Sequence, residues 1–230
     1  MKDDPTKDHP PIWGSDGSQV LFKERYPVVL KTYDKWKNRF EKLKIEKLKI
    51  SKKLENLGIS HSTSNSSMAE LTFNKKKCLD LAKKVGLKTA KSQLIKKGQS
   101  IDEKKIRNKI GFPCFVKPNQ SGSSFGISKV YSEKELKPAV EKALKEDNEI
   151  LIESYLSGRE VTVGVYKLNG KVEVLPITEI VSRNDFFDYK AKYEDESDEI
   201  TPAILPIELE KKVKKDALNL YTKLNLSGIT

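Results

Sequence analysis

The chain has 230 residues, enough for one large domain or two small ones, and its 33% charged and 37% hydrophobic residues exclude a wholly disordered protein. No apolar run approaches the roughly 20 residues that span a bilayer, and no apolar stretch near Met1 resembles a secretory signal, so no membrane partner is expected. Two cysteines and two histidines cannot form a disulfide framework or a zinc cluster, which favours a cytoplasmic location.

The first third of the chain is predicted to be irregular and then helical. Residues 1–30 hold several prolines and glycines and are expected to lack regular structure. Apolar residues at helical spacing predict a helix over 31–57 that Gly58 ends. A polar loop is expected at 61–67, followed by a helix over 73–85.

The middle of the chain alternates between predicted helices and strands. Capping-box patterns at Ser100 and Ser132 predict helices that run to about 110 and about 146. Strands are predicted at 114–117 and 127–131, on either side of a glycine- and serine-rich turn, and at 150–153.

The last third is predicted to contain a hairpin and a long helix. Asn169-Gly170 is a strong two-residue hairpin signal between strands at 161–167 and 172–180. A helix is expected over 208–224. Strands and helices that alternate in this way, with a hairpin among them, indicate a mixed α/β fold.

The net charge of +11 is concentrated in one region, since residues 31–110 carry about +15. Only five of the 44 basic residues are arginines, whereas base recognition favours bidentate arginine. A nucleic-acid partner is therefore not expected. A solvated lysine-rich face and a polyanion-binding patch both remain open.

Residues 112–126 form the most informative segment. A strand delivers Lys117, Pro118 stops it, and a small-residue loop with Gly122, Ser123 and Ser124 follows. Successive N–H groups in such a loop can bind an anion, and Lys117 would supply the countercharge. A phosphate cradle and an ordinary hairpin loop both fit this pattern.

Residues 150–163 contain a buried strand that ends in Glu153, a turn at Gly158 and a second strand that begins at Glu160. Backbone groups at the end of a strand can recognise an adenine edge, and Tyr155 could pack on its face. The alternative is a hairpin with exposed acids.

Residues 184–193 mix aromatic and charged side chains without a clear period. Such a loop is typical of a lid that packs when a ligand binds. A loop held in place by its own aromatic side chains is the other interpretation.

Together these segments resemble the D-alanine–D-alanine ligases of the ATP-grasp superfamily over Leu54 to Thr230. The resemblance lies in eight spaced stretches in the same order, at residues 54–59, 69–75, 115–118, 122–126, 152–153, 158–163, 187–193 and 200–203.

The resemblance implies an ATP-grasp fold with two α/β subdomains around ATP, and a reaction that joins two D-alanines through an acyl phosphate for peptidoglycan precursors. It assigns residues 54–72 to the end of the amino-terminal domain, 73–153 to the central subdomain and 154–230 to part of the carboxy-terminal subdomain, and it leaves 1–53 as a divergent segment of unknown role. A homodimer is common in the family and is expected by the same resemblance.

The resemblance also assigns roles to individual residues. It places Lys75, Lys117 and Lys192 at the phosphates of ATP, with the loop residues Gly122, Ser123 and Ser124. It places Glu153, Tyr155 and Leu156 at the adenine and Glu160 at the ribose. Tyr193 pairs with Ser123 to close the site, so Ser123, Lys192 and Tyr193 are the expected catalytic residues.

Two parts of the family pattern have no counterpart in this sequence. Nothing in residues 1–53 matches the amino-terminal catalytic glutamate, and the arginine and the Glu-x-Asn pair that binds Mg²⁺ or Mn²⁺ in the family are absent. Because the metal neutralises charge during phosphoryl transfer, we expect this chain alone to have little or no ligase activity. A catalytically silent ATP-binding module and a lysine-rich nucleic-acid-binding protein are the alternative functions.

Overall fold

The computed structural model describes residues 50–59, 61–62, 64–122, 124–186 and 197–230. The chain divides into two units, Met1–Lys47 and Leu48–Thr230, and all described residues belong to the second. Residues 50–56 are helical, and Gly58 follows them in a left-handed conformation, as predicted for that part of the 31–57 helix. The rest of that predicted helix lies outside the described residues.

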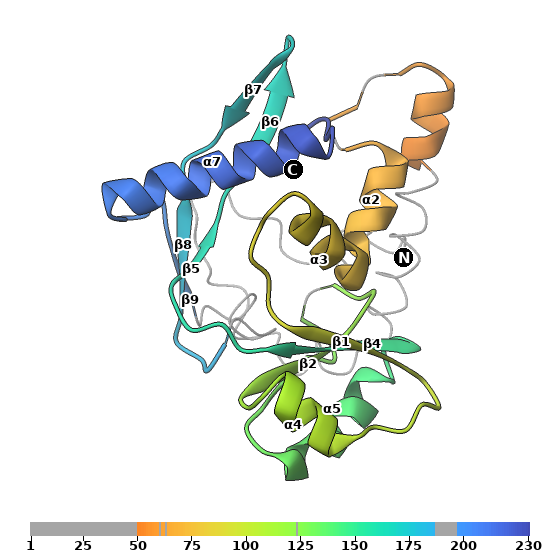
Figure 1. Cartoon of the computed structure of the whole chain (residues 1–230). Helices are drawn as coiled ribbons and strands as arrows, with labels where there is room; N and C mark the ends of the chain where they lie inside the picture. Colours follow the sequence, from red (N-terminus) through yellow and green to blue (C-terminus); the bar gives the residue numbers. More distant parts are fainter. Residues whose placement is uncertain (1–49, 60, 63, 123, 187–196) are drawn as a thin grey trace, which may run out of the picture. The chain divides into compact units, whose positions relative to one another are not determined.

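The largest sheet of the described residues, called the central sheet here, has four antiparallel strands in the order β1-β4-β2-β3. Its strands are β1 (Ser92–Lys96), β2 (Cys114–Pro118), β3 (Ser128–Val130) and β4 (Glu149–Ser154). The helices α4 (Glu103–Lys109) and α5 (Glu133–Ala143) lie together along one face of this sheet (Figure 1).

Side-chain alternation along β2 and β4 separates the two faces of the sheet. Cys114 and Val116 on β2 and Ile150 and Ile152 on β4 are fully buried in the cluster that packs against α4 and α5. Each such side chain contributes about 1.5–3 kcal/mol by leaving water. Because neighbouring residues of a strand point to opposite faces, the residues between them are directed to the other face, where the candidate site lies.

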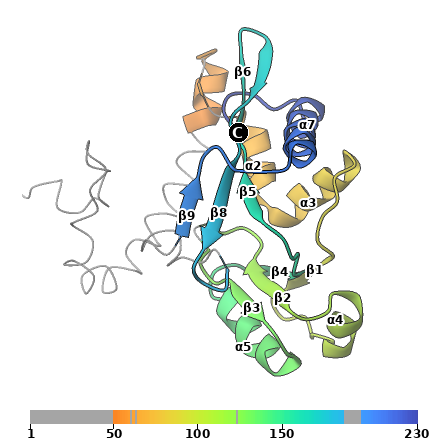
Figure 2. The same ribbon diagram turned by 90° about the vertical axis from the view of Figure 1, so that its left-hand side faces the viewer.

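The carboxy-terminal half contains two smaller sheets and a long helix. The strands β5 (Glu160–Thr162), β8 (Thr178–Ser182) and β9 (Ser197–Ile200) form one antiparallel sheet. The hairpin β6 (Val165–Leu168) and β7 (Lys171–Val174) packs against α7 (Ile207–Lys223) through the buried Tyr221 (Figure 2). The Asn-Gly hairpin prediction is confirmed, because Asn169 and Gly170 have φ values of 50° and 80° and join paired strands.

The predicted helix over 73–85 is confirmed as α3 (Lys75–Lys84), and a further short helix, α2 (Ser66–Phe73), takes the place of the last part of the predicted polar loop. The loop prediction for 61–67 is wrong beyond Asn65, whose side chain accepts the Met68 amide and starts α2. Asn74 then interrupts the helix and caps α3 by accepting the Lys77 amide. Local amide side chains therefore set these boundaries, which hydrophobic spacing alone does not show.

Three other predictions need correction. The helix near residue 100 begins after Asp102, whose carboxylate caps the Lys105 amide, so the capping box at Ser100 is wrong. The predicted strands 161–167 and 172–180 are each broken in two, near Gly164 and near Leu175. A Cβ on Gly164 would lie 2.9 Å from the Leu175 side chain, so the chain segments approach closely where both strands break. The strands β1 and β9 were not predicted.

The strand predictions at 114–117, 127–131 and 150–153 and the helix prediction at 208–224 are confirmed to within a few residues. Within the described ranges, no helix combines the length and the apolar character needed to cross a bilayer.

Candidate nucleotide-binding site

An ion pair lies on the face of the central sheet opposite α4 and α5. Lys117 on β2 and Glu153 on β4 form this pair, and their side chains are 23% and 8% exposed. Their strand neighbours Val116 and Ile152 point to the other face, which is why these two side chains reach the same face. The Lys117 ammonium and the Glu153 carboxylate are therefore held together in a mostly buried position.

Aromatic rings lie beside this ion pair. Phe115 is directly opposite Glu153 in the strand register. Its ring centroid is 6.2 Å from that of Tyr155 and 5.3 Å from that of Phe186, the latter in an edge-on arrangement. Such a cluster offers apolar ring surface next to a carboxylate, which suits a planar base that carries an exocyclic amine.

Lys129 connects the sheet to the segment that contains Phe186. Its ammonium lies 4.4 Å from the centroid of the Tyr155 ring and 2.7 Å from a carboxylate oxygen of Asp185. The Tyr131 hydroxyl donates to the other oxygen of Asp185. The hydrogen bond from Lys129 lowers the pKa of Asp185, and the same bond raises the pKa of Lys129. Both groups are therefore charged at neutral pH and hold residues 185–186 against β3.

The glycine-rich loop after β2 is closely tied to its surroundings. The Lys75 ammonium, at the start of α3, donates to the carbonyl of Ser121 at 2.7 Å. Gly126 has a φ of +70°, and a Cβ there would lie 2.6 Å from the Cγ atom of Glu146, so the position requires glycine. The loop joins antiparallel strands, so the hairpin interpretation is correct for its topology, and the phosphate-cradle interpretation is compatible with it.

The segment after β4 leaves the sheet at Leu156, whose side chain is 65% exposed. Among the described residues, Leu156 has no hydrogen-bond partner, so its backbone groups are available to a ligand. The following strand β5 pairs with β8 and not with β4, so the alternative of a hairpin with exposed acids is wrong.

The position of Glu160 depends on its neighbour Arg159, which makes a bidentate ion pair with Glu179 on β8, with both distances at 2.5 Å. The hydrogen bonds from Arg159 lower the pKa of Glu179. This pair fixes β5, whose first residue Glu160 is exposed.

The predicted site residues are thus brought together in part. Lys117 and Glu153 form one contact, Tyr155 adjoins them through Phe115, and Lys75 contacts the loop that contains Gly122. Ser124 has a φ of 57° within the same loop. The hydrogen bonds and ion pairs of the described residues do not join Glu160 to this group. Three predicted residues, Ser123, Lys192 and Tyr193, lie outside the described residues.

Sequence reasoning missed Phe115 and Lys129 as members of the site, and it included Phe186 only as part of the possible lid at 184–193. Phe115 lies two residues before Lys117 on the same strand, so both side chains point to one face, and this spacing could have identified Phe115. Lys129 and Phe186 could not be found in this way, because their positions depend on contacts with Asp185 and Phe115 across long sequence separations.

The described residues do not include a donor set for a metal ion, since no three His, Cys, Asp or Glu side chains among them gather closely enough. The described part of the chain therefore lacks a cluster of ligands for the metal expected from the family.

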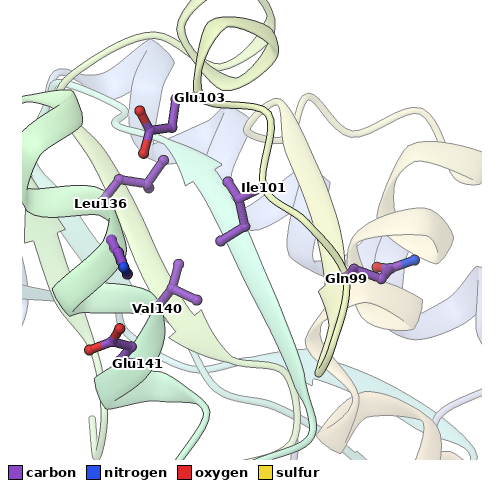
Figure 3. Close-up of a pocket in the computed structure, with 7 residues that line it drawn as sticks. Gln99, Ile101, Glu103, Leu136, Val140 and Glu141 are labelled. Carbon is purple, nitrogen blue, oxygen red and sulfur yellow. The ribbon is translucent and has the colours of Figure 1, made fainter.

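A separate hollow of about 300 Å³ lies on the other side of the sheet, between α5 and the loop that precedes α4 (Figure 3). Ile101, Leu136 and Val140 point into it, with charged and amide groups at its rim. No predicted site residue lines it, and it is separated from Lys117 by the sheet itself.

Comparison with known proteins identifies the family. The family model described as D-ala D-ala ligase C-terminus matches residues 81–230. A D-alanine–D-alanine ligase of Flavobacterium johnsoniae is 53% identical over 176 residues, which cover 76% of this chain and 54% of the relative. That of Flavobacterium psychrophilum is 42% identical over 226 residues and covers 94% of this chain and 69% of the relative. Residues 54–230 alone make up less than 94% of this chain, so the match to this relative extends into residues 1–53. The chain thus spans about half to two thirds of the length of these relatives.

Solved structures agree with the sequence matches. The VanG D-Ala:D-Ser ligase of Enterococcus faecalis has a TM-score of 0.67 at 30% identity, over 78% of this chain and 53% of that one. The D-alanine–D-alanine ligase of Bacillus anthracis, solved in complex with ATP, has a TM-score of 0.64 at 29% identity, over 78% of this chain and 56% of that one. With its ATP-grasp fold and its match over residues 81–230, the chain belongs to the D-alanine–D-alanine ligase family.

Proposed function

We propose that this chain binds ATP on the face of its central sheet opposite α4 and α5 and acts in the ATP-dependent joining of two D-alanines for peptidoglycan precursor synthesis. The observation that carries the proposal is the Lys117–Glu153 pair beside the Phe115 aromatic cluster, within the region that matches the family. The relative solved with ATP supports the choice of nucleotide.

The lysines and the glycine-rich loop would hold the triphosphate. Lys117 lies near the end of β2, shortly before this loop, and Lys75 reaches the loop from α3. Two ammonium groups near backbone N–H donors can neutralise a polyphosphate, and phosphoryl transfer depends mainly on such positioning and charge neutralisation. Gly122, Ser123 and Ser124 would provide the loop contacts, and Lys192 would add a third cation.

The base and the ribose would lie along the end of β4. Glu153 is a carboxylate acceptor for an amino group, and the exposed backbone of Leu156 can pair with the edge of a purine. Tyr155, Phe115 and Phe186 provide ring surface for the purine face. Glu160, at the start of β5, would accept from the ribose hydroxyls.

The chemistry that ATP supplies when bound is the activation of a D-alanine carboxylate as an acyl phosphate, which the amine of a second D-alanine attacks. We propose that Ser123 and Tyr193 close the site over this reaction, with Lys192, and that residues 73–153 and 154–230 are the two subdomains involved. A bound Mg²⁺ or Mn²⁺, a homodimer and a cytoplasmic location remain predictions from the family.

A titration of the chain with nucleotides tests this proposal. Isothermal calorimetry should show binding of ATP that is at least about tenfold tighter than binding of GTP, because the guanine edge presents an acceptor where adenine presents its amine to Glu153. Binding of neither nucleotide at millimolar concentration would refute the proposal.

A second assay separates the ligase from a silent ATP-binding module. ADP release from ATP that requires D-alanine and does not occur with L-alanine supports the ligase. Saturable ATP binding without such release in a chain of the full length of the relatives would favour the silent module.

A further inference from the structure

Asn119 is a fully buried polar residue at the point where β2 passes into the glycine-rich loop. Its backbone N–H donates to the carbonyl of Glu149 at 2.8 Å, and its side-chain amide donates to the Glu149 carboxylate at 3.0 Å. Its carbonyl accepts the Lys75 amide at 3.1 Å, and its side-chain oxygen accepts the Lys76 amide at 2.9 Å. All four kinds of polar group on this residue are therefore satisfied, as burial requires.

These bonds join three segments that are distant in the sequence. Glu149 begins β4, Lys75 and Lys76 begin α3, and Asn119 itself opens the loop. The orientation of the Asn119 amide is fixed by its partners, because the Lys76 amide can only donate and the Glu149 carboxylate accepts. Buried networks that are fully satisfied are rigid, so the start of α3 and the loop are held as one piece.

The hydrogen bonds between Asn119 and the start of α3 also set the position of the Lys75 side chain. The first amides of a helix lack partners within the helix, and here two of them, those of Lys75 and Lys76, donate to Asn119. The Lys75 side chain, one residue earlier, then reaches the Ser121 carbonyl at 2.7 Å. Lys117 lies near the end of β2, which Pro118 ends, so only one residue separates it from Asn119 at the start of the loop.

We propose that Asn119 is a positioning residue, which sets the Lys75 ammonium and the glycine-rich loop relative to Lys117 so that they bind one triphosphate together. The inference rests on the proposed function, because it concerns the phosphates of the same nucleotide. Asn119 itself is buried and touches no ligand, so it acts only through Lys75 and the loop.

The variant Asn119→Asp tests the proposal with almost no change of shape. It keeps the acceptor for Lys76 but replaces the amide donor with a second carboxylate, about 3.0 Å from that of Glu149. The two charges repel, so α3 and the loop separate. The double variant Asn119→Asp, Glu149→Gln restores one hydrogen bond with donor and acceptor exchanged, and the single variant Glu149→Gln is the matched control.

Affinities for ATP and for adenosine are measured by calorimetry on each folded variant of the whole chain. Asn119→Asp should weaken ATP binding about tenfold or more and change adenosine binding less than about twofold, because adenosine has no phosphates. Glu149→Gln and the double variant should bind ATP within about threefold of the unaltered chain. If Asn119→Asp does not fold, Asn119→Ser, which is too short to reach both partners, should show the same selective loss.

Several results would overturn the inference. These are unchanged ATP affinity in Asn119→Asp, an equal loss for ATP and adenosine, and a double variant that stays as weak as the single one. If the unaltered chain binds no ATP, the proposed function fails as well. If the unaltered chain binds ATP but the Asn119 variants show no selective loss of ATP affinity, only this inference is refuted.

Discussion

The substitution Lys117→Met separates the structural role of the Lys117–Glu153 pair from its role in binding ATP. Methionine keeps the length and the packing of the lysine stem and removes the ammonium. The Glu153 carboxylate, only 8% exposed, is then left without its cation. Removal of one partner of a buried ion pair costs about 3–5 kcal/mol, and the 23% exposure of Lys117 places the expected loss of unfolding free energy at about 2–3 kcal/mol.

The effect on ATP has a separate origin and magnitude. A charge-assisted hydrogen bond contributes about 1.5–3 kcal/mol, so loss of the Lys117 contact should weaken ATP binding about ten- to a hundredfold. The double variant Lys117→Met, Glu153→Gln removes the unpaired buried charge as well. It should therefore recover most of the stability but not the affinity for ATP.

Urea unfolding followed by circular dichroism measures the first effect, and calorimetric titration with ATP measures the second. Lys171→Met is the matched control, because Lys171 is 78% exposed on β7, away from the site, and should leave both quantities unchanged. The reasoning is wrong if Lys117→Met is as stable as the unaltered chain, or if the double variant recovers the affinity for ATP together with the stability.

Three further predictions concern the core and the loop. Ile152→Ala, at a fully buried position on β4, should lower the unfolding free energy by about 2–5 kcal/mol in urea titrations, and a loss below about 1 kcal/mol would contradict the described core. Gly126→Ala should lower the unfolding free energy by about 1–3 kcal/mol, because φ at this residue is +70° and the new Cβ would clash with Glu146. Equal urea midpoints for Gly126→Ala and the unaltered chain would show that the loop has another conformation. Burial raises the pKa of the Cys114 thiol to about 11. Mass spectrometry should therefore find Cys114 unmodified by iodoacetamide at pH 8 in the folded chain and modified in urea. Fast labelling of Cys114 without urea would contradict its burial.

The strands and helices with a strong local signal could be predicted from the sequence. The apolar run at 150–153, the Asn169-Gly170 turn and the periodic helix near the end of the chain each specify their structure with neighbouring residues alone. The break between α2 and α3 could not be predicted from spacing, because it depends on whether the Asn74 side chain caps a helix or faces solvent.

The site was predicted in its residue types but not in its contacts. Lys117 and Glu153 were each expected near ATP, yet their ion pair depends on the register between β2 and β4, which are more than thirty residues apart. Asn119 carried no signal at all, since an asparagine after a proline is ordinary in a loop. Its importance follows only from the burial and the partners that the fold gives it.

Hydrogen exchange of the chain with and without ATP tests the central claim most directly, because it locates the bound nucleotide. If ATP binds on the face of the sheet opposite α4 and α5, amides in residues 115–126 and 153–160 should exchange more slowly in its presence. Residues 136–141 of α5, which line the hollow on the other face, should be unaffected. Protection centred on α5 and the hollow, with none in the loop after β2, would contradict the proposed site.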